Sequence, residues 1–189
     1  MDDLVTRNEK ILNKEKTALL IVDIQEKILN VMHSPKEVIS NTLKLIRGCK
    51  ILGIPIFFTE QYPKGLGPTA GELLDELKDL VPIQKMSFSC SGADELFATL
   101  KLKNISQVVV CGIESHVCVQ QTVLDLLAND FQVDVASDAI SSRKEFDYTI
   151  ALQRMSKNGA EITSTEAILF ELLNVCGTDE FKQISKIVK

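Results

Sequence analysis

Short apolar runs alternate along the chain with longer segments in which apolar residues recur every three or four positions. Short runs bounded by turn residues predict buried strands, whereas a period of about 3.6 residues predicts amphipathic helices. The predicted strands are 17–24, 54–59, 81–85, 105–113, 132–136 and 161–163. The predicted helices are 35–52, 71–80, 94–102, 117–129, 145–157 and 166–175, with a last turn or two over 181–188. Segment 60–70 contains two prolines and two glycines and is expected to be a loop.

The alternation predicts one α/β domain over residues 1–189. Strands separated by helices of this length form a mostly parallel sheet with helices on both faces. Right-handed crossovers then place the carboxyl end of every strand at one edge of the sheet. Residues that end separate strands are therefore expected to become neighbours at that edge, where open parallel sheets bind ligands.

Three chemically reactive side chains stand at the predicted strand ends. Asp23 closes the first strand, Lys85 closes the third, and Cys118 begins the helix that follows the fourth. Each has an ordinary alternative: Asp23 could cap a loop, Lys85 could be an exposed lysine, and Cys118 could be a small core residue. Because all three should meet at one edge, they predict a functional site. The second and fifth strands are followed at this edge by Thr59, Glu60 and Asp138.

The surroundings expected for Cys118 suit thiol chemistry. A helix N-terminus and a nearby ammonium are expected to lower the pKa of its thiol, and the Asp23 carboxylate can accept the thiol proton. Backbone N–H groups in the turn 112–117 can stabilise the oxyanion that forms when a thiolate attacks a carbonyl.

The sequence gives less support to a Cys–His pair, a serine nucleophile, a nucleotide-binding site or a metal site. His116 lies two residues before Cys118, and residues at that spacing do not face each other on a helix, so His116 is expected to line the pocket or to pack. Ser115 is not within a G-x-S-x-G motif, and the chain has no dinucleotide or phosphate-binding glycine motif. Two histidines and the absence of C-x-x-C disfavour a metal site, so neither a metal nor a cofactor is expected.

Composition and charge narrow the range of partners. The formal net charge of −5, without a basic stripe, disfavours nucleic acid. The apolar runs are far shorter than the roughly 20 residues of a membrane helix, so no membrane partner is expected. Five cysteines and an N-terminus without an apolar export signal predict reduced thiols and a cytoplasmic location.

Three motifs at these positions resemble the isochorismatase-like cysteine hydrolases. They are LIVDIQ at 20–25, the lysine at position 85 and GIESHVCV at 112–119. The segments 60–68 and 163–167 are most similar to the isochorismatase domain-containing protein 2 subgroup, and the resemblance extends over residues 17–175. It implies a Rossmann-like, three-layer αβα fold with a six-stranded parallel sheet, and a homo-oligomer of two or more chains.

The resemblance also implies roles for individual residues. It assigns a catalytic triad to Asp23, Lys85 and Cys118, and a non-proline cis peptide to Ile113–Glu114, where it directs a backbone N–H toward the oxyanion. The residues expected to bind a small-molecule substrate are Gln25, Glu60, Tyr62, Phe88 and His116. For Tyr62 and Phe88, plain packing is an equal alternative.

Two departures from the family patterns restrict the expected reaction. Metal-dependent nicotinamidases of this superfamily carry Asp-x-His and a further histidine, but residues 59–61 read Thr-Glu-Gln here. Isochorismatases proper lack the cysteine. We therefore expect a metal-free, amidase-like hydrolase of small amides or related non-peptide C–N bonds, acting through a Cys118 thioester. The alternative is a catalytically silent interaction or scaffold protein, or a thiol-redox protein, with the same fold.

Overall fold

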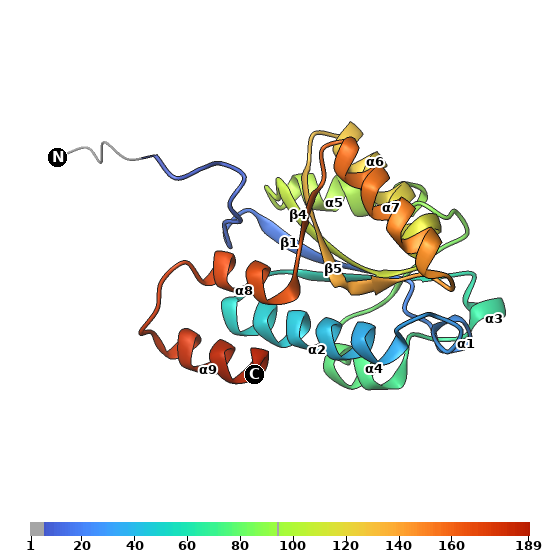
Figure 1. Ribbon diagram of the computed structural model, residues 1–189, viewed down its shortest axis with the longest axis horizontal. Coiled ribbons are helices and arrows are strands. Elements are labelled where there is room, and N and C mark those ends of the chain that lie inside the picture. The colour runs from blue at the N-terminus through green and yellow to red at the C-terminus, as the bar shows by residue number, and fades with distance from the viewer. Residues whose placement is uncertain (1–5, 94) are drawn as a thin grey trace.

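A parallel β-sheet forms the centre of the computed structural model, which describes residues 6–93 and 95–189 (Figure 1). Within these residues the strands are β1 (Thr17–Val22), β2 (Ile56–Gln61), β3 (Ile83–Lys85), β4 (Gln107–Ile113), β5 (Gln132–Ser141) and β6 (Glu161–Thr163). They lie in the order β3-β2-β1-β4-β5-β6, and each pairing is parallel. The predicted α/β fold with a six-stranded parallel sheet is confirmed.

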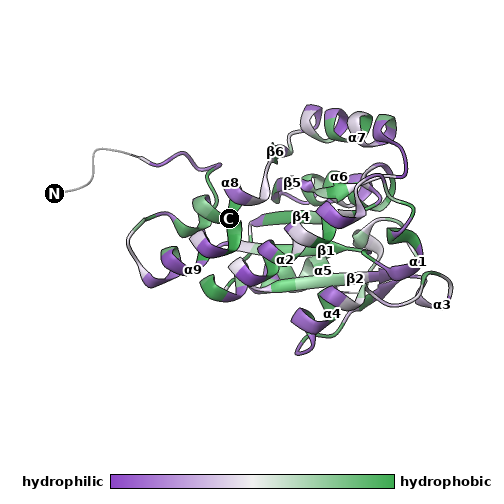
Figure 2. Ribbon diagram, turned by 60° about the horizontal axis from the view of Figure 1, so that its bottom comes forward, coloured by the Kyte–Doolittle hydropathy of each residue, from purple (hydrophilic) through white to green (hydrophobic). Residues whose placement is uncertain are grey.

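Helices cover both faces of the sheet and complete the three layers (Figure 1). One face carries α2 (Pro35–Leu52), α4 (Gly71–Leu77), α8 (Thr165–Leu173) and α9 (Asp179–Val188). The other face carries α5 (Leu96–Leu102), α6 (Gln120–Ala128) and α7 (Glu145–Lys157). Hydrophobic residues concentrate in the strands, and hydrophilic residues mark parts of α4 and α7 (Figure 2). Because both faces of the sheet are covered, β1 and β4 are buried along their whole length.

Most element boundaries lie within a few residues of those predicted from the sequence, and differences occur at both edges of the sheet. α2 begins at Pro35 and ends before Gly53, as the preference for proline at a helix start and glycine after its end favours. The short helices α1 (Glu26–Leu29) and α3 (Pro63–Leu66) were not predicted, and α3 lies within the expected loop 60–70. The predicted helix 94–102 starts at a residue outside the described ranges, and α5 begins at Leu96.

β5 extends past its predicted end at residue 136 because it bulges against β4. Near Gly112 the register shifts, so that five residues of β5 pass two residues of β4. Asp138 therefore lies within the strand, and its Oδ1 accepts hydrogen bonds from Thr165 N and Thr165 Oγ1 at 2.8 and 2.9 Å. The expectation that Asp138 follows the fifth strand is wrong, and its carboxylate instead holds the start of α8.

Gly112 allows β1 and β4 to approach closely at the point where the strand order reverses. Ligands bind open parallel sheets at such points. The φ angle of Gly112 is +127°, and a Cβ atom on it would lie 2.1 Å from the carbonyl oxygen of Val22. Since that neighbour is backbone and cannot rotate away, only glycine fits. The contact lies one residue before Asp23 and so helps to position the candidate acid.

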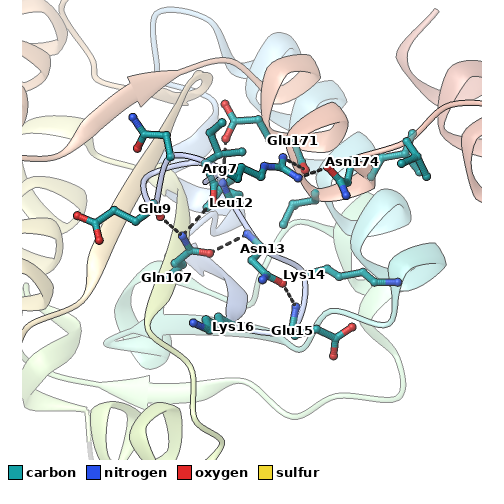
Figure 3. A pocket seen from close by; sticks show the side chains of 15 residues that line it. Arg7, Glu9, Leu12, Asn13, Lys14, Glu15, Lys16, Gln107, Glu171 and Asn174 are labelled. Carbon is teal, nitrogen blue, oxygen red and sulfur yellow. Dashed lines mark hydrogen bonds between the residues drawn. The ribbon is translucent and has the colours of Figure 1, made fainter. Parts of the chain in front are cut away.

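The segment 6–16 covers the opposite, amino-terminal edge of the sheet. Gln107 Oε1 accepts a hydrogen bond from Asn13 N at 2.8 Å, and Glu171 Oε2 accepts one from Leu12 N at 3.0 Å. A cavity of about 430 Å³ lies beside this segment, and Figure 3 shows hydrogen bonds between some of its lining residues, such as Arg7 with Asn174 and Asn13 with Gln107. These hydrogen bonds hold the segment against the sheet, far from the strand ends that carry the reactive residues.

Gly112→Ala is expected to lower the free energy of unfolding by about 2–4 kcal/mol, because overpacking adds to an unfavourable φ angle. The matched control is Gly53→Ala, which also places alanine at a positive φ but meets no atom within 4 Å. It should cost about 1 kcal/mol. Urea unfolding followed by circular dichroism measures both, and equal losses would contradict the importance of the close approach.

Candidate active site

A buried ion pair joins the ends of β1 and β3. Lys85 Nζ lies 2.6 Å from Asp23 Oδ2, and the two residues are 4% and 2% exposed. Lys85 Nζ also donates to the carbonyl oxygens of Ser87 and Phe88 at 3.1 and 2.9 Å. From the intervening strand β2, Thr59 Oγ1 donates to Asp23 Oδ1 at 2.7 Å. The pair is thus hydrogen-bonded on both sides, as buried charges require.

Cys118 lies in the π-helical turn Ser115–Val119, between β4 and α6. The turn is closed by a hydrogen bond from Val119 N to Glu114 O at 3.2 Å, which spans five residues. The thiol is therefore in a wide turn that precedes α6, and not in the first turn of an ordinary α-helix as predicted. Such turns are frequent at functional sites. The Cys118 Sγ atom is 3.3 Å from Gln61 Oε1.

The pKa of the Cys118 thiol is raised, mainly by burial and next by the negative charge of Asp23, while Lys85 lowers it to a smaller extent. The predicted direction was therefore wrong. The reason is geometric: the Cys118 side chain is buried, and the Lys85 ammonium is already paired with the Asp23 carboxylate. The resting group is a thiol beside a candidate base, which suits proton transfer during attack.

A pocket of about 270 Å³ lies at the switch point between β1 and β4. Its lining combines two carboxylates, a thiol and a carboxamide with aliphatic and aromatic side chains. The lining residues are Asp23, Ile28, Gln61, Tyr62, Leu66, Phe88, Ile113, Glu114, Val117 and Cys118. The structure thus brings Asp23 and Cys118 into one pocket, with Lys85 bonded to Asp23 beside it.

Three residues expected in the pocket do not line it. Glu60 Oε1 accepts hydrogen bonds from Thr69 N and Thr69 Oγ1 at 2.8 and 3.0 Å, on the other side of β2. His116 Nδ1 is 2.9 Å from Ser142 Oγ, so His116 packs toward the end of β5. Gln25 is fully buried and bonds to backbone.

Gln61 is a polar pocket residue that the sequence did not single out. Successive side chains of a strand point to opposite faces, so Thr59 and Gln61 share the face that Glu60 does not. Thr59 contacts Asp23, and Gln61 contacts Cys118. The alternation counted from Thr59 could have identified Gln61, had the strand been known to continue to that residue.

Two pocket residues have uncommon backbone conformations. Asp23 and Tyr62 have φ angles of 51° and 40°, a region that aspartate tolerates and bulky residues rarely adopt. Tyr62 N donates to Lys85 O at 2.9 Å, and the Tyr62 ring lies against Gly65, where a Cβ atom would fall 2.2 Å from the ring. Conformations of this kind cluster at functional sites.

The oxyanion residues predicted from the resemblance also border the pocket. The Ile113–Glu114 peptide bond is cis. The Glu114 carboxylate accepts hydrogen bonds from Arg143 Nε at 2.9 Å and from Arg143 N at 3.3 Å. Within the described ranges, no group of three or more His, Cys, Asp or Glu side chains is placed to hold a metal ion. In the same ranges, no helix is long and apolar enough to cross a membrane.

Asp23→Asn is expected to speed the alkylation of Cys118 by iodoacetamide near neutral pH by about tenfold or more, because it removes a charge that raises the thiol pKa. Lys85→Met should slow alkylation, because the ammonium lowers that pKa. In the wild type the rate should climb as the pH becomes alkaline. Peptide mass spectrometry measures the rates, with the exposed Cys176 as internal reference. Slower labelling in Asp23→Asn would contradict this electrostatic assignment.

Comparisons with known proteins agree with this architecture. The Isochorismatase domain model matches residues 17–167. Isochorismatase domain-containing protein 2 from Danio rerio is 37% identical over 177 residues, which cover 94% of this chain and 89% of the relative. The solved structure of the MAR1 ribonuclease from Caenorhabditis elegans is 37% identical, with a TM-score of 0.87 and coverage of 94% and 91% of the two chains.

The YcaC gene product from Escherichia coli, described as an octameric hydrolase of unknown specificity, has a TM-score of 0.88 at 23% identity. The aligned part covers 96% of this chain and 92% of that one, and the likeness shows a shared fold. Since the domain model spans most of the sequence and the Danio rerio relative aligns over nearly all of it, the chain belongs to the isochorismatase family and has the fold of its hydrolases.

Proposed function

We propose that this protein is a metal-free cysteine hydrolase of small amides or related C–N bonds, with Asp23, Lys85 and Cys118 as its catalytic triad. One observation carries the proposal: a buried thiol and a carboxylate line the same pocket, and an ammonium holds the carboxylate in place. Family membership supports a hydrolase-type function.

The first half of the proposed reaction forms a thioester. As Cys118 Sγ attacks the carbonyl carbon of the amide, its proton passes to Asp23. The backbone N–H groups of Glu114 and Cys118 hold the oxyanion of the tetrahedral intermediate. Asp23 then gives the proton to the leaving amine, the C–N bond breaks, and the acyl group stays on sulfur. Lys85 keeps the carboxylate aimed at the thiol throughout.

The second half hydrolyses the thioester. Asp23 takes a proton from water, whose oxygen attacks the acyl carbon, and the proton then returns to sulfur as the carboxylic acid leaves. The net reaction consumes one amide and one water and produces one acid and one amine. The proposed steps use no metal. At residues 59–61, where the metal-dependent relatives carry Asp-x-His, this chain has Thr59 and Gln61 at the two ligand positions, and their side chains contact Asp23 and Cys118.

Phosphodiester cleavage, which the name of the Caenorhabditis elegans relative indicates for that protein, fits this pocket less well. A phosphate needs cations that are free to stabilise its oxygens. Here Lys85 is paired with Asp23 and Arg143 with Glu114. The net charge of −5 also opposes the approach of a nucleic acid. We therefore propose a small-molecule substrate, and a homo-oligomeric assembly of the kind described for YcaC.

Cys118→Ser, Asp23→Asn and Lys85→Met are each expected to lower kcat/KM by about 10³-fold or more. The three residues are proposed to act as one catalytic unit, so the loss of any one removes most of the rate enhancement. The control His116→Gln changes a residue that packs outside the pocket and should stay within about threefold of the wild type. The substrate for these measurements is identified by screening a panel of small amides, ureas and carbamoyl compounds. Ammonia or amine release measures turnover, and mass spectrometry detects the acyl group on Cys118.

An unchanged kcat/KM in Cys118→Ser would contradict the thioester mechanism. If no compound in the panel releases amine or leaves an adduct on Cys118, the alternative of a silent scaffold or thiol-redox protein is favoured instead.

A further inference from the structure

The side chain of Gln25 holds the backbone of Gln61 through two hydrogen bonds. Gln61 N donates to Gln25 Oε1 at 2.8 Å, and Gln25 Nε2 donates back to Gln61 O at 3.1 Å and to Gly67 O at 2.7 Å. Gln25 is fully buried, so this pair of hydrogen bonds is shielded from water. The Gln61 side chain therefore projects into the pocket from a fixed point.

The Gln61 carboxamide faces the reacting thiol. Its Oε1 accepts a hydrogen bond from the Cys118 thiol at 3.3 Å, and the Asp23 carboxylate, the proposed acceptor of the thiol proton, lines the same pocket. A thiol has one hydrogen and can donate a well-aligned hydrogen bond to only one of these two acceptors at a time. Any ligand group that donates a hydrogen bond to Gln61 Oε1 would direct the thiol hydrogen toward Asp23, its proposed base.

The ionic groups at the pocket are already paired. The Asp23 carboxylate is bonded to Lys85, and the Glu114 carboxylate is bonded to Arg143. A charged substrate would find no free counter-charge among these groups, and its desolvation would not be offset. The remaining walls come from Ile28, Leu66, Phe88 and Val117, which favour an apolar substituent.

We infer that Gln61 is the specificity-determining residue of the pocket, and that it selects small, uncharged amides whose N–H donates to Gln61 Oε1. Binding of this N–H releases the thiol hydrogen to Asp23, so recognition and activation of the nucleophile are coupled. The coupling to turnover rests on the proposed hydrolase function, whereas the selection of neutral N–H donors can be measured without turnover.

The test uses three alkylating probes that differ in one property each: iodoacetamide is a neutral N–H donor, methyl iodoacetate is a neutral ester, and iodoacetate is an anion. Their rates at Cys118 are divided by their rates at the exposed Cys176 of the same molecule, which cancels intrinsic reactivity. In the wild type, this normalised rate should be about 10-fold or more higher for iodoacetamide than for either other probe.

Gln61→Met keeps the length of the side chain but removes the amide. It should lower the normalised iodoacetamide rate about 10-fold and leave the methyl iodoacetate rate within about threefold. Gln84→Met makes the same change at an exposed position on β3 and should alter none of the rates. Labelling of the buried Cys49 reports any loss of folding in the variants.

Equal normalised rates for the three probes in the wild type would overturn the inference, and so would an equal loss of all three in a folded Gln61→Met variant. Selective labelling by iodoacetamide with no amide turnover in the panel would uphold the selection by Gln61 while the hydrolase proposal fails. Turnover of charged amides with no selectivity among the probes would support the hydrolase proposal and contradict the selection by Gln61.

Discussion

The buried ion pair between Lys85 and Asp23 is the interaction on which the candidate site depends. Removing one partner from such a pair costs about 3–5 kcal/mol, because the remaining charge stays in a medium of low dielectric. Lys85 also bonds the carbonyl oxygens of Ser87 and Phe88, so the same ammonium fixes the segment that carries Phe88 to the pocket wall. With Thr59 bonded to Asp23, one set of contacts ties together β1, β2 and β3.

The strand order makes this pair possible. β2 separates β3 from β1, and neighbouring strands lie about 4.8 Å apart, so the ammonium must cross roughly 10 Å. A long lysine side chain meeting a shorter aspartate covers that span, and Thr59 on the intervening strand is small enough to let it pass. On the other side of β1, Gly112 brings β4 close, and the turn after β4 carries Cys118 to the same crevice.

Burial and the negative charge of Asp23 both raise the pKa of the Cys118 thiol, and the Lys85 ammonium, which is paired with Asp23, lowers it to a smaller extent. A cysteine of this kind is protected as a thiol until a partner removes its proton. The position of Gln61 adds a second acceptor for that proton. In the proposed enzyme, reactivity would thus depend on what occupies the pocket and not on a permanently ionised nucleophile.

The sequence by itself determined the parallel sheet, its helical layers and the convergence of Asp23, Lys85 and Cys118, because hydrophobic periodicity and the handedness of crossovers are local or topological rules. It did not place Gln61 beside the thiol, since the predicted strand stopped at residue 59, whereas β2 continues to Gln61. Nor could it place Asp138 within β5, because the bulge arises from pairing with β4. The tertiary structure alone decided the pKa of Cys118, because that value depends on burial and on charges that only the fold brings together.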